Sequence, residues 1–392
     1  MRFTKKVSIL LLLSVLFFSG SILMIDNWRA FQNILAPLSL LLFFCYLLDN
    51  NIKVYVKNTS TLLFYLFILW ALSSALYNSS ISMMFQILQL AVVYLALVLI
   101  FPSLYKRESN FLVINAIFLS HFPLVVIPLL VDGINSMPYT GIFYNPNSFG
   151  TVSATLLAVF LSIIIDNITS KRLKKIYFFI VIILSALSFV GIIYSASRTS
   201  FLTALLLVFI TIFLYLVKLY NKGIIKLFKQ SIYFLVSIMI ISIVLFVPGT
   251  IRDVFVNNIL DKNQRRSEGE SGVFSNRDDM WITAIQEAGI FGNGYDYFYL
   301  NFGRGAHNTF IAILGVYGWV SIILFLLFLC TAFIFSFKYA IYSNDKFTFL
   351  PILLLTTFFA LSLGEGMLMK LSMLGSFATY GVVVNYKYNS RY

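Results

Sequence analysis

Histidine and arginine side chains gather in one long polar stretch, 248–318, of a chain that is otherwise mostly apolar. Its GRGAHNTF segment places Arg304, His307 and Asn308 at the start of an apolar run, and Arg277 lies upstream. Arg304 and Asn308 are candidates for binding the substrate. Histidine can take a proton from a hydroxyl near neutral pH. Arginine suits a diphosphate, because its planar group offers paired donors. The set fits the attack of a hydroxyl on a sugar with a diphosphate leaving group. A His–Asn pair at a helix start is more often a cap beside a surface histidine, so both interpretations stay open.

The segment 132–148, DGINSMPYTGIFYNPNS, is a second polar site. Its Gly, Pro and Asn residues favour turns over helix. The side-chain amides of Asn145 and Asn147 can hydrogen-bond hydroxyls, which makes both of them candidates for binding a sugar substrate. Equally, Asn147 or Ser148 can be the N-cap of an ordinary helix that follows.

SASRTS, residues 195–200, is a very short gap between two apolar runs, so Arg198 must lie at the membrane edge. An arginine at this depth usually faces a cavity or a partner, which makes Arg198 a candidate for holding the leaving group. The alternative is that its side chain snorkels to lipid phosphate. Arg265 and Arg266, inside the long polar stretch, are further candidate substrate-binding residues.

Glu365, between Gly364 and Gly366, is a further outward position that breaks the apolar pattern. It can pair with Lys370 of the next run, and such a pair can be structural only. Reactive residues inside apolar runs favour structural roles. His121 sits in the middle of a run, where a hydrogen-bonded core histidine is favoured over a functional one. Cys45 and Cys330 show no metal or disulfide spacing. No cofactor motif and no metal-ligand cluster is apparent.

Composition predicts the fold class. The chain is 60% hydrophobic and only 11% charged, and apolar runs of about 20 residues, enough to cross a bilayer as a helix, recur throughout. The runs lack the alternation of a transmembrane barrel. We therefore expect an all-α polytopic membrane protein with about twelve transmembrane helices. The expected spans are 7–25, 30–48, 61–77, 83–101, 111–131, 148–165, 176–194, 199–217, 231–248, 308–337, 347–363 and 367–385.

The basic residues predict the orientation. With both termini in the cytoplasm, cytoplasmic segments carry 19 of the 28 Lys and Arg but four of the 15 Asp and Glu. The net charge of +13 is then a topology signal, and no nucleic-acid partner is needed to explain it. The chain divides into nine spans in 1–248, an extracytoplasmic loop in 249–307 and three spans in 308–392.

The end of the extracytoplasmic loop carries the signals of a short amphipathic helix. NRDDMWITAIQEAG, 276–289, has a capping Asn, two Asp in the first turn, apolar residues on one face and a closing Gly. We expect this helix to lie on the membrane surface or against the outer ends of the spans, with Arg277 at its start.

The order and spacing of these motifs resemble those of the O-antigen ligase and polymerase family of bacterial membrane proteins. The resemblance spans most of the chain, and FYNPNSFG at 143–150 is similar to a family element before the sixth span. The family often has a Pro before its Gly-x-Gly, where this chain has Ala288-Gly289-Ile290-Phe291. The matching residues are Ser197, Arg198, Arg277, Trp281, Gly292, Gly294, Phe298, His307, Asn308, Gly315 and Gly318.

The resemblance implies a function at the outer face of the bacterial cytoplasmic membrane. It implies glycosyl transfer without metal or cofactor, in which Arg198 and Arg277 hold the diphosphate and His307 assists the acceptor. Donor and acceptor are undecaprenyl-diphosphate-linked glycans, and membrane lipids, a flippase and a chain-length regulator are the further partners.

Three functions compete at this point. We favour a polysaccharide polymerase, which moves the growing glycan from its lipid carrier onto the next lipid-linked repeat unit of an O-antigen or capsule. A ligase of the same family would transfer the glycan to an acceptor that is not the carrier. A flippase for the same lipid-linked glycan would show inverted repeats and charged residues near the bilayer midplane, and neither stands out in this sequence.

Overall fold

The computed structural model describes residues 2–22, 25, 41, 59–94, 108–131, 133–134, 137–170, 173–220 and 277–366. These ranges form helices and turns and contain no strand. The predicted all-helical class is therefore confirmed for the described part of the chain.

Six of the described helices are long and apolar enough to cross a membrane, which indicates a multi-pass membrane protein. They are α3 Thr59–Tyr77, α6 Ser109–Val131, α7 Pro146–Ser170, α8 Lys175–Tyr194, α9 Arg198–Tyr220 and α16 Trp319–Tyr342. Three further helices carry shorter apolar stretches, namely α1 Arg2–Ile22, α4 Ile81–Tyr94 and α17 Leu350–Ser362. Five predicted spans coincide with described helices to within a few residues. They are 61–77 (α3), 111–131 (α6), 148–165 (α7), 176–194 (α8) and 199–217 (α9). The predicted spans 231–248 and 367–385 lie outside the described residues, as do all of the span 30–48 except residue 41 and the 249–276 part of the 249–307 loop, so the count of twelve stays a prediction.

The predicted span 308–337 is two helices rather than one. α15, Thr309–Tyr317, ends at Gly318, and α16 begins directly after it. Gly318 has a left-handed φ of 89°, and a side chain added there would strike the carbonyl oxygen of Ile290. Only glycine adopts this conformation without cost at so close an approach. The amide of Trp319, the first residue of α16, donates to the carbonyl of Gly289 at 3.2 Å. The turn that contains Gly289 therefore packs against the break between α15 and α16.

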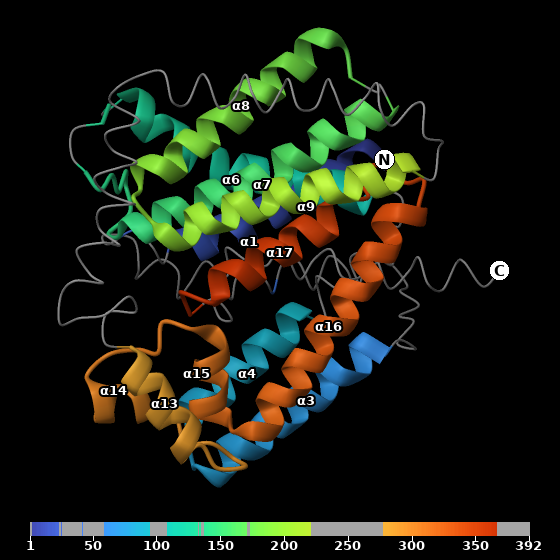
Figure 1. Cartoon of the computed structure of the whole chain (residues 1–392). Coiled ribbons are helices and arrows are strands. Elements are labelled where there is room, and N and C mark those ends of the chain that lie inside the picture. The colour runs from blue at the N-terminus through green and yellow to red at the C-terminus, as the bar shows by residue number, and fades with distance from the viewer. Residues whose placement is uncertain are drawn as a thin grey trace.

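α7 is the central helix of the larger of two helix groups. Its most apolar window is 83% buried, and α6, α8, α9 and α17 pack against it (Figure 1). Small residues let these helices approach closely, as is common in membrane bundles. A side chain added at Gly150 of α7 would meet the hydroxyls of Ser195 and Ser200 at 2.7 Å. One added at Gly191 of α8 would meet Ser153 Oγ at 2.9 Å.

The second group contains α3, α4 and the first part of α16 (Figure 1). Contacts between aromatic rings join these three helices. The ring of Phe64 stacks on that of Tyr94 with centroids 3.8 Å apart, and it lies 4.9 Å from the ring of Phe328. The rings of Phe67 and Phe325 lie 5.2 Å apart. α16 therefore ties the two groups together, because it also contacts α9 and α17.

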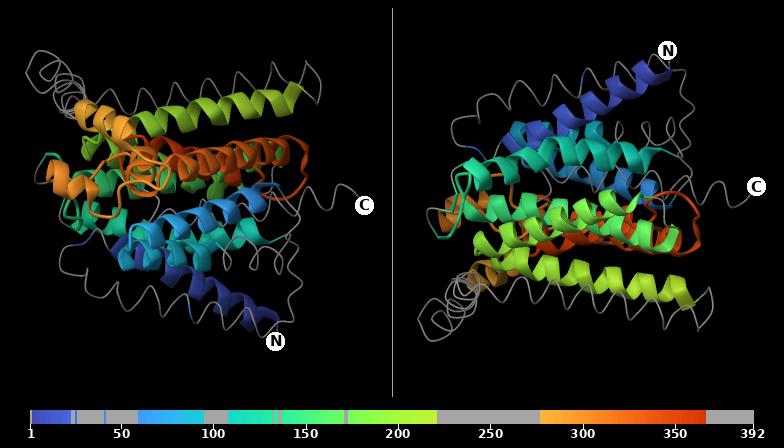
Figure 2. Two further views of the ribbon diagram at one scale, coloured as in Figure 1. Left: turned by 90° about the horizontal axis from the view of Figure 1, so that it is seen from below. Right: turned by 90° about the horizontal axis from the view of Figure 1, so that it is seen from above.

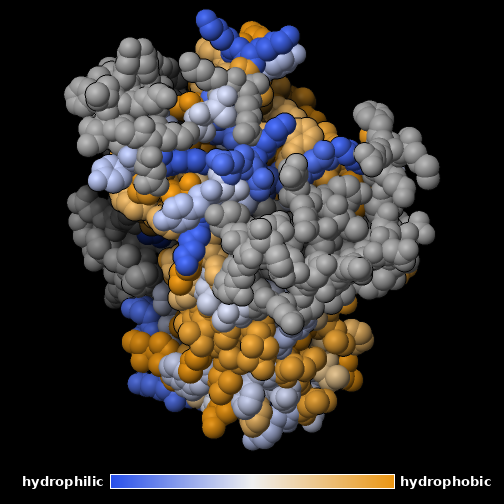
Figure 3. Space-filling view, turned by 90° about the vertical axis from the view of Figure 1, so that its right-hand side faces the viewer, coloured by the Kyte–Doolittle hydropathy of each residue, from blue (hydrophilic) through white to orange (hydrophobic). Residues whose placement is uncertain are grey.

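The long described helices run between two ends of the bundle, and their termini gather at these two ends (Figure 2). We call them the Glu365 end and the Lys346 end. The Glu365 end contains the starts of α7, α9 and α15 and the ends of α3, α6, α8 and α17. The Lys346 end contains the starts of α1, α6 and α8 and the ends of α7, α9 and α16. Figure 3 faces the Lys346 end, where hydrophilic side chains gather mainly in the upper half and hydrophobic ones cover the lower part, over α3 and α4.

Two short helices and α15 form a small module at the Glu365 end. α13, Asp278–Glu287, packs against α15, and α14, Tyr297–Phe302, lies between them in sequence. Their buried residues form a core of their own, made of Met280, Ala284, Tyr297, Phe298 and Ala306. The predicted amphipathic helix 276–289 is thus confirmed as a helix over α13, and its apolar face covers α15.

Candidate functional site

His307 lies directly before α15, on a segment that is held from both sides. Its φ of +50° is in the left-handed region, which few non-glycine residues adopt and which is often found at functional sites. On the preceding side, Trp281 of α13 donates its indole N–H to the carbonyl of Ala306 at 2.9 Å. On the following side, Asn308 caps α15, because its Oδ1 accepts from the amides of Phe310 and Ile311 at 2.9 and 3.2 Å.

Asn308 is therefore a cap, as one of the two interpretations of the His–Asn pair predicts. Its side-chain amide also donates to the carbonyl of Leu363 at 3.1 Å. Both polar ends of this buried side chain are thus engaged within the protein, although the sequence had made Asn308 a candidate for binding the substrate.

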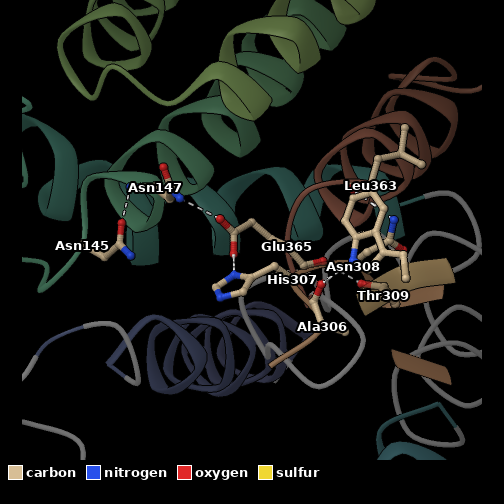
Figure 4. Close-up of polar contacts among 9 residues, drawn as sticks. Asn145, Asn147, Ala306, His307, Asn308, Thr309, Leu363 and Glu365 are labelled. Atoms are coloured by element: carbon tan, nitrogen blue, oxygen red, sulfur yellow. Dashed lines mark hydrogen bonds and ion pairs between the residues drawn. The ribbon is translucent and has the colours of Figure 1, made fainter. Parts of the chain in front are cut away.

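Glu365 is the centre of the site (Figure 4). One carboxylate oxygen, Oε1, accepts from the side-chain amide of Asn147 at 2.7 Å. The other, Oε2, lies 3.6 Å from Nδ1 of His307. The main-chain carbonyl of Glu365 also accepts from the hydroxyl of Thr309 at 2.9 Å. The starts of α7 and α15 are therefore joined through the segment that follows α17. The side chain of Glu365 is 12% exposed and that of His307 is 40% exposed, so the imidazole stays accessible to a substrate.

The start of α7 brings Asn147 to this carboxylate. Asn145, rather than the predicted Asn147 or Ser148, is the cap, because its Oδ1 accepts from the amide of Asn147 at 2.8 Å. Pro146 then occupies the first helical position, where its lack of an N–H costs nothing. This arrangement leaves the side chain of Asn147 free of the capping role and available to Glu365.

The start of α9 lies on the other side of the same segment. Ser197 precedes the helix, and its hydroxyl lies 3.4 Å from the amide of Ser200 and 3.0 Å from the hydroxyl of Ser200. Arg198 is the first helical residue and is partly buried. Thr199 packs so closely on Gly364 that a side chain added at Gly364 would overlap it. Arg198 directly precedes Thr199, and Glu365 directly follows Gly364. The contact between Thr199 and Gly364 therefore brings the backbones of Arg198 and Glu365 close together.

Arg277 and Arg304 lie on the module that carries His307. Arg277 precedes the first turn of α13 and is one helical turn from Trp281, so the two share a face of that helix. Arg304 is partly buried in the segment between α14 and α15, three residues before His307. Arg265 and Arg266, the other two arginines that the sequence proposes, lie outside the described residues.

The glycines of the predicted motif let the parts of the module pack closely, and the neighbouring Phe291 holds the module against α3. Side chains added at Gly292 and Gly318 would strike the backbone of the facing turn, so these two turns meet backbone to backbone. A side chain added at Gly315 would lie 2.6 Å from the ring of Phe298. Phe291, near the position where the resembling family often has Pro, stacks between Trp70 and Tyr77 of α3, with ring centroids 5.2 and 4.8 Å away.

The charge of this end differs in kind from that of the other. Every basic residue described at the Glu365 end is an arginine, namely Arg198, Arg277 and Arg304. Three helices, α7, α9 and α15, begin here, and helix starts favour anions through their unpaired amides and dipoles. Arginine side chains and helix starts both favour anions, so this end of the bundle suits an anionic group such as a diphosphate. Among the described residues, no group of three or more His, Cys, Asp or Glu could hold a metal ion.

A tyrosine–glutamate contact stabilises the module beneath the site. The hydroxyl of Tyr297 donates to Glu287 Oε2 at 2.6 Å. Burial raises the pKa of Tyr297, and the hydrogen bond to Glu287 and the charge of Glu287 raise it further. Tyr297 therefore stays a neutral donor that joins α13 to α14.

Glu365 is the site residue that sequence reasoning missed. The sequence paired it with Lys370, which lies outside the described residues. The signal that could have found it was available, because an acid beside a membrane-spanning run is costly unless it has a partner or a function.

No family model matches the sequence, and neither the curated proteins nor the solved structures contain a match. The resemblance to the O-antigen ligase and polymerase family therefore stays a prediction that rests on the motif residues.

Proposed function

We propose that this chain is a membrane glycosyltransferase of the bacterial cytoplasmic membrane that polymerises polyprenyl-diphosphate-linked repeat units into a surface polysaccharide. The observation that carries the proposal is the placement of His307 beside Glu365. Asn147 at the start of α7 binds this carboxylate, Thr199 at the start of α9 packs on Gly364, and Trp281 of α13 binds the carbonyl of Ala306. The motif resemblance supports the same class of reaction.

The proposed orientation places the Glu365 end outside the cell. Seven lysines of described segments lie at the Lys346 end, and positively charged segments favour the cytoplasm. The lysines are Lys5, Lys6, Lys174, Lys175, Lys218, Lys338 and Lys346. Both termini are then cytoplasmic, and the site meets glycans that have already crossed the membrane.

In the proposed reaction, the acceptor is a sugar hydroxyl of the next lipid-linked repeat. Nε2 of His307 takes the hydroxyl proton while the oxygen forms a bond to the anomeric carbon of the growing glycan. The bond from that carbon to the lipid diphosphate breaks, and its electron pair leaves with the diphosphate. Arg198 and Arg277 stabilise the charge on this leaving group by bidentate hydrogen bonds.

Cells that depend on this protein for polymer provide the test. His307→Ala is expected to abolish polymer and to leave single lipid-linked repeats accumulating outside, because base assistance contributes about 10²–10⁴-fold. Asp296→Asn is the control, since Asp296 is an exposed acid of the same module whose side chain caps nothing. If cells with the His307→Ala protein accumulate long chains that stay on the carrier, the protein is a ligase instead. If they accumulate repeat units trapped inside the cell, the protein is a flippase. Normal polymer from the His307→Ala protein would contradict the proposal.

A further inference from the structure

The two oxygens of the Glu365 carboxylate face different neighbours. Oε1 accepts from Asn147 Nδ2 at 2.7 Å, and Oε2 faces His307 Nδ1 at 3.6 Å (Figure 4). We infer that Glu365 is a positioning residue that fixes the imidazole of His307 with its hydrogen on Nδ1 and its lone pair on Nε2, and that Asn147 fixes Glu365. The inference rests on the proposed role of His307 as the base.

The position of the imidazole hydrogen decides whether His307 can work. A neutral imidazole has one donor nitrogen and one acceptor nitrogen, and the partner of one nitrogen sets the role of the other. An ionised carboxylate can only accept, so Nδ1 must donate to it, and Nε2 is left as the acceptor for the hydroxyl proton. The 3.6 Å separation is slightly longer than a hydrogen bond. Catalytic hydrogen bonds in ligand-free sites are often long and shorten when the substrate binds.

The backbone around the pair is held by contacts that do not involve this carboxylate. Trp281 binds the carbonyl of Ala306, Asn308 binds the carbonyl of Leu363, and Thr309 binds the main-chain carbonyl of Glu365. The register between the two segments therefore survives a change of the Glu365 side chain. What the carboxylate adds is the orientation and the tautomer of the imidazole.

An amide at position 365 cannot meet both neighbours. Glu365→Gln keeps one acceptor oxygen and replaces the other by an NH₂ group. If the NH₂ faces Asn147, two donors meet; if it faces His307, the imidazole hydrogen is driven to Nε2. A second change resolves the conflict. Asn147→Asp provides an acceptor for the NH₂ of the new glutamine, whose oxygen is then free to accept from His307 Nδ1.

Nitrogen NMR of the full-length protein, labelled with ¹⁵N-histidine, reads the tautomer without any substrate. The chain has two histidines, so His307→Gln identifies the signals of His307. At mildly alkaline pH the wild-type protein is expected to carry the hydrogen of His307 on Nδ1. Glu365→Gln should shift it toward Nε2, and the double variant should return it to Nδ1. A hydrogen on Nε2 in the wild-type protein would overturn the inference, even if no variant accumulates in the membrane.

Transfer kinetics with lipid-linked repeat units give the second readout. Glu365→Gln is expected to lower kcat about 10²-fold with little change in KM, as for loss of general base assistance. Addition of Asn147→Asp should recover kcat several-fold, whereas Asp296→Asn should leave the wild-type rate unchanged. A folded Glu365→Gln protein with wild-type kcat, or no recovery in the double variant, would overturn the inference. If the tautomer responds as expected and His307 proves unnecessary for transfer, the proposed function fails on its own.

Discussion

The two ends of the bundle use polar residues in different ways. At the Lys346 end, Lys218 donates to the carbonyl of Ala340 and to Thr348, both at 3.2 Å. Asn110 donates to the carbonyls of Lys346 and Phe347 at 3.0 and 3.1 Å. These contacts join helix ends to one another. At the Glu365 end, the described cations are arginines, and a half-exposed histidine faces the one acid that joins α7 to α15.

The comparison teaches that the nature of the polar groups, more than their number, separates a structural end from a candidate active end. Lysine provides a single flexible charge, which suits contacts with scattered carbonyls and a cytoplasmic surface. Arginine provides a planar set of donors that matches a diphosphate. Changes at the Glu365 end should therefore alter the reaction, and changes at the Lys346 end should alter stability.

The largest expected effect comes from arginines at the Glu365 end. Arg198→Ala and Arg277→Ala should each remove on the order of 2–5 kcal/mol of substrate or transition-state stabilisation, with normal protein levels in the membrane. Arg198→Lys should restore little, because a point charge lacks the paired donors. Gel analysis of polymer length and immunoblots of the membrane fraction measure both quantities.

Lys218→Arg at the Lys346 end is the control, because it also exchanges one basic residue for another, and it should leave polymer length unchanged. Full polymer synthesis by the Arg198→Ala protein would contradict the proposed role of Arg198. Loss of synthesis in a stable Lys218→Arg protein would remove the distinction between the two ends.

A smaller effect is expected from Asp166 at the Lys346 end. Its Oδ1 accepts from the amide of Phe347 at 3.0 Å, and Asp166 is 6% exposed. Phe347 has a φ of 56°, so the turn between α16 and α17 relies on this contact. Asp166→Ala should lower the free energy of unfolding by about 1–3 kcal/mol, the usual cost of leaving a buried donor unsatisfied. Thermal unfolding in detergent measures the loss, and transfer per folded molecule should not change. Reduced transfer without reduced stability would show that Asp166 acts in the reaction.

Reporter fusions should change neither activity nor stability, and they test the orientation. Fusions at Lys174, Lys222 and Lys346 are expected to report the cytoplasm, and a fusion near Glu268 is expected to report the exterior, because the basic residues divide in this way. An exterior signal at Lys346 would invert the bundle and place the Glu365 end in the cytoplasm.

Most of the helices could be predicted from the sequence, because each is a continuous apolar run bounded by polar residues. The break at Gly318 could not, since the run 308–337 is apolar on both sides of it and the left-handed turn is needed only where the backbone of Ile290 approaches. The cap of α7 was predictable in principle, because Pro146 favours the first helical position and therefore points to Asn145.

The site was predicted in part. His307, Asn308 and Arg277 follow from a local pattern, and the structure gives them a common module with Trp281. Glu365 could be suspected from the sequence as a costly acid beside an apolar run, but its partners could not be identified from any sequence window. Its role depends on three segments, at 147, 307 and 365, that meet only when α7, α15 and α17 pack together.

Reconstitution tests the central claim most directly. Purified wild-type protein in lipid vesicles, supplied with a lipid-linked repeat unit and no other protein, should produce a ladder of longer glycans on the carrier. His307→Gln keeps a hydrogen-bonding side chain but cannot take the proton, so its rate should fall by about 10²–10⁴-fold. Near-normal chain length from the His307→Gln protein would contradict the assignment of His307 as the base.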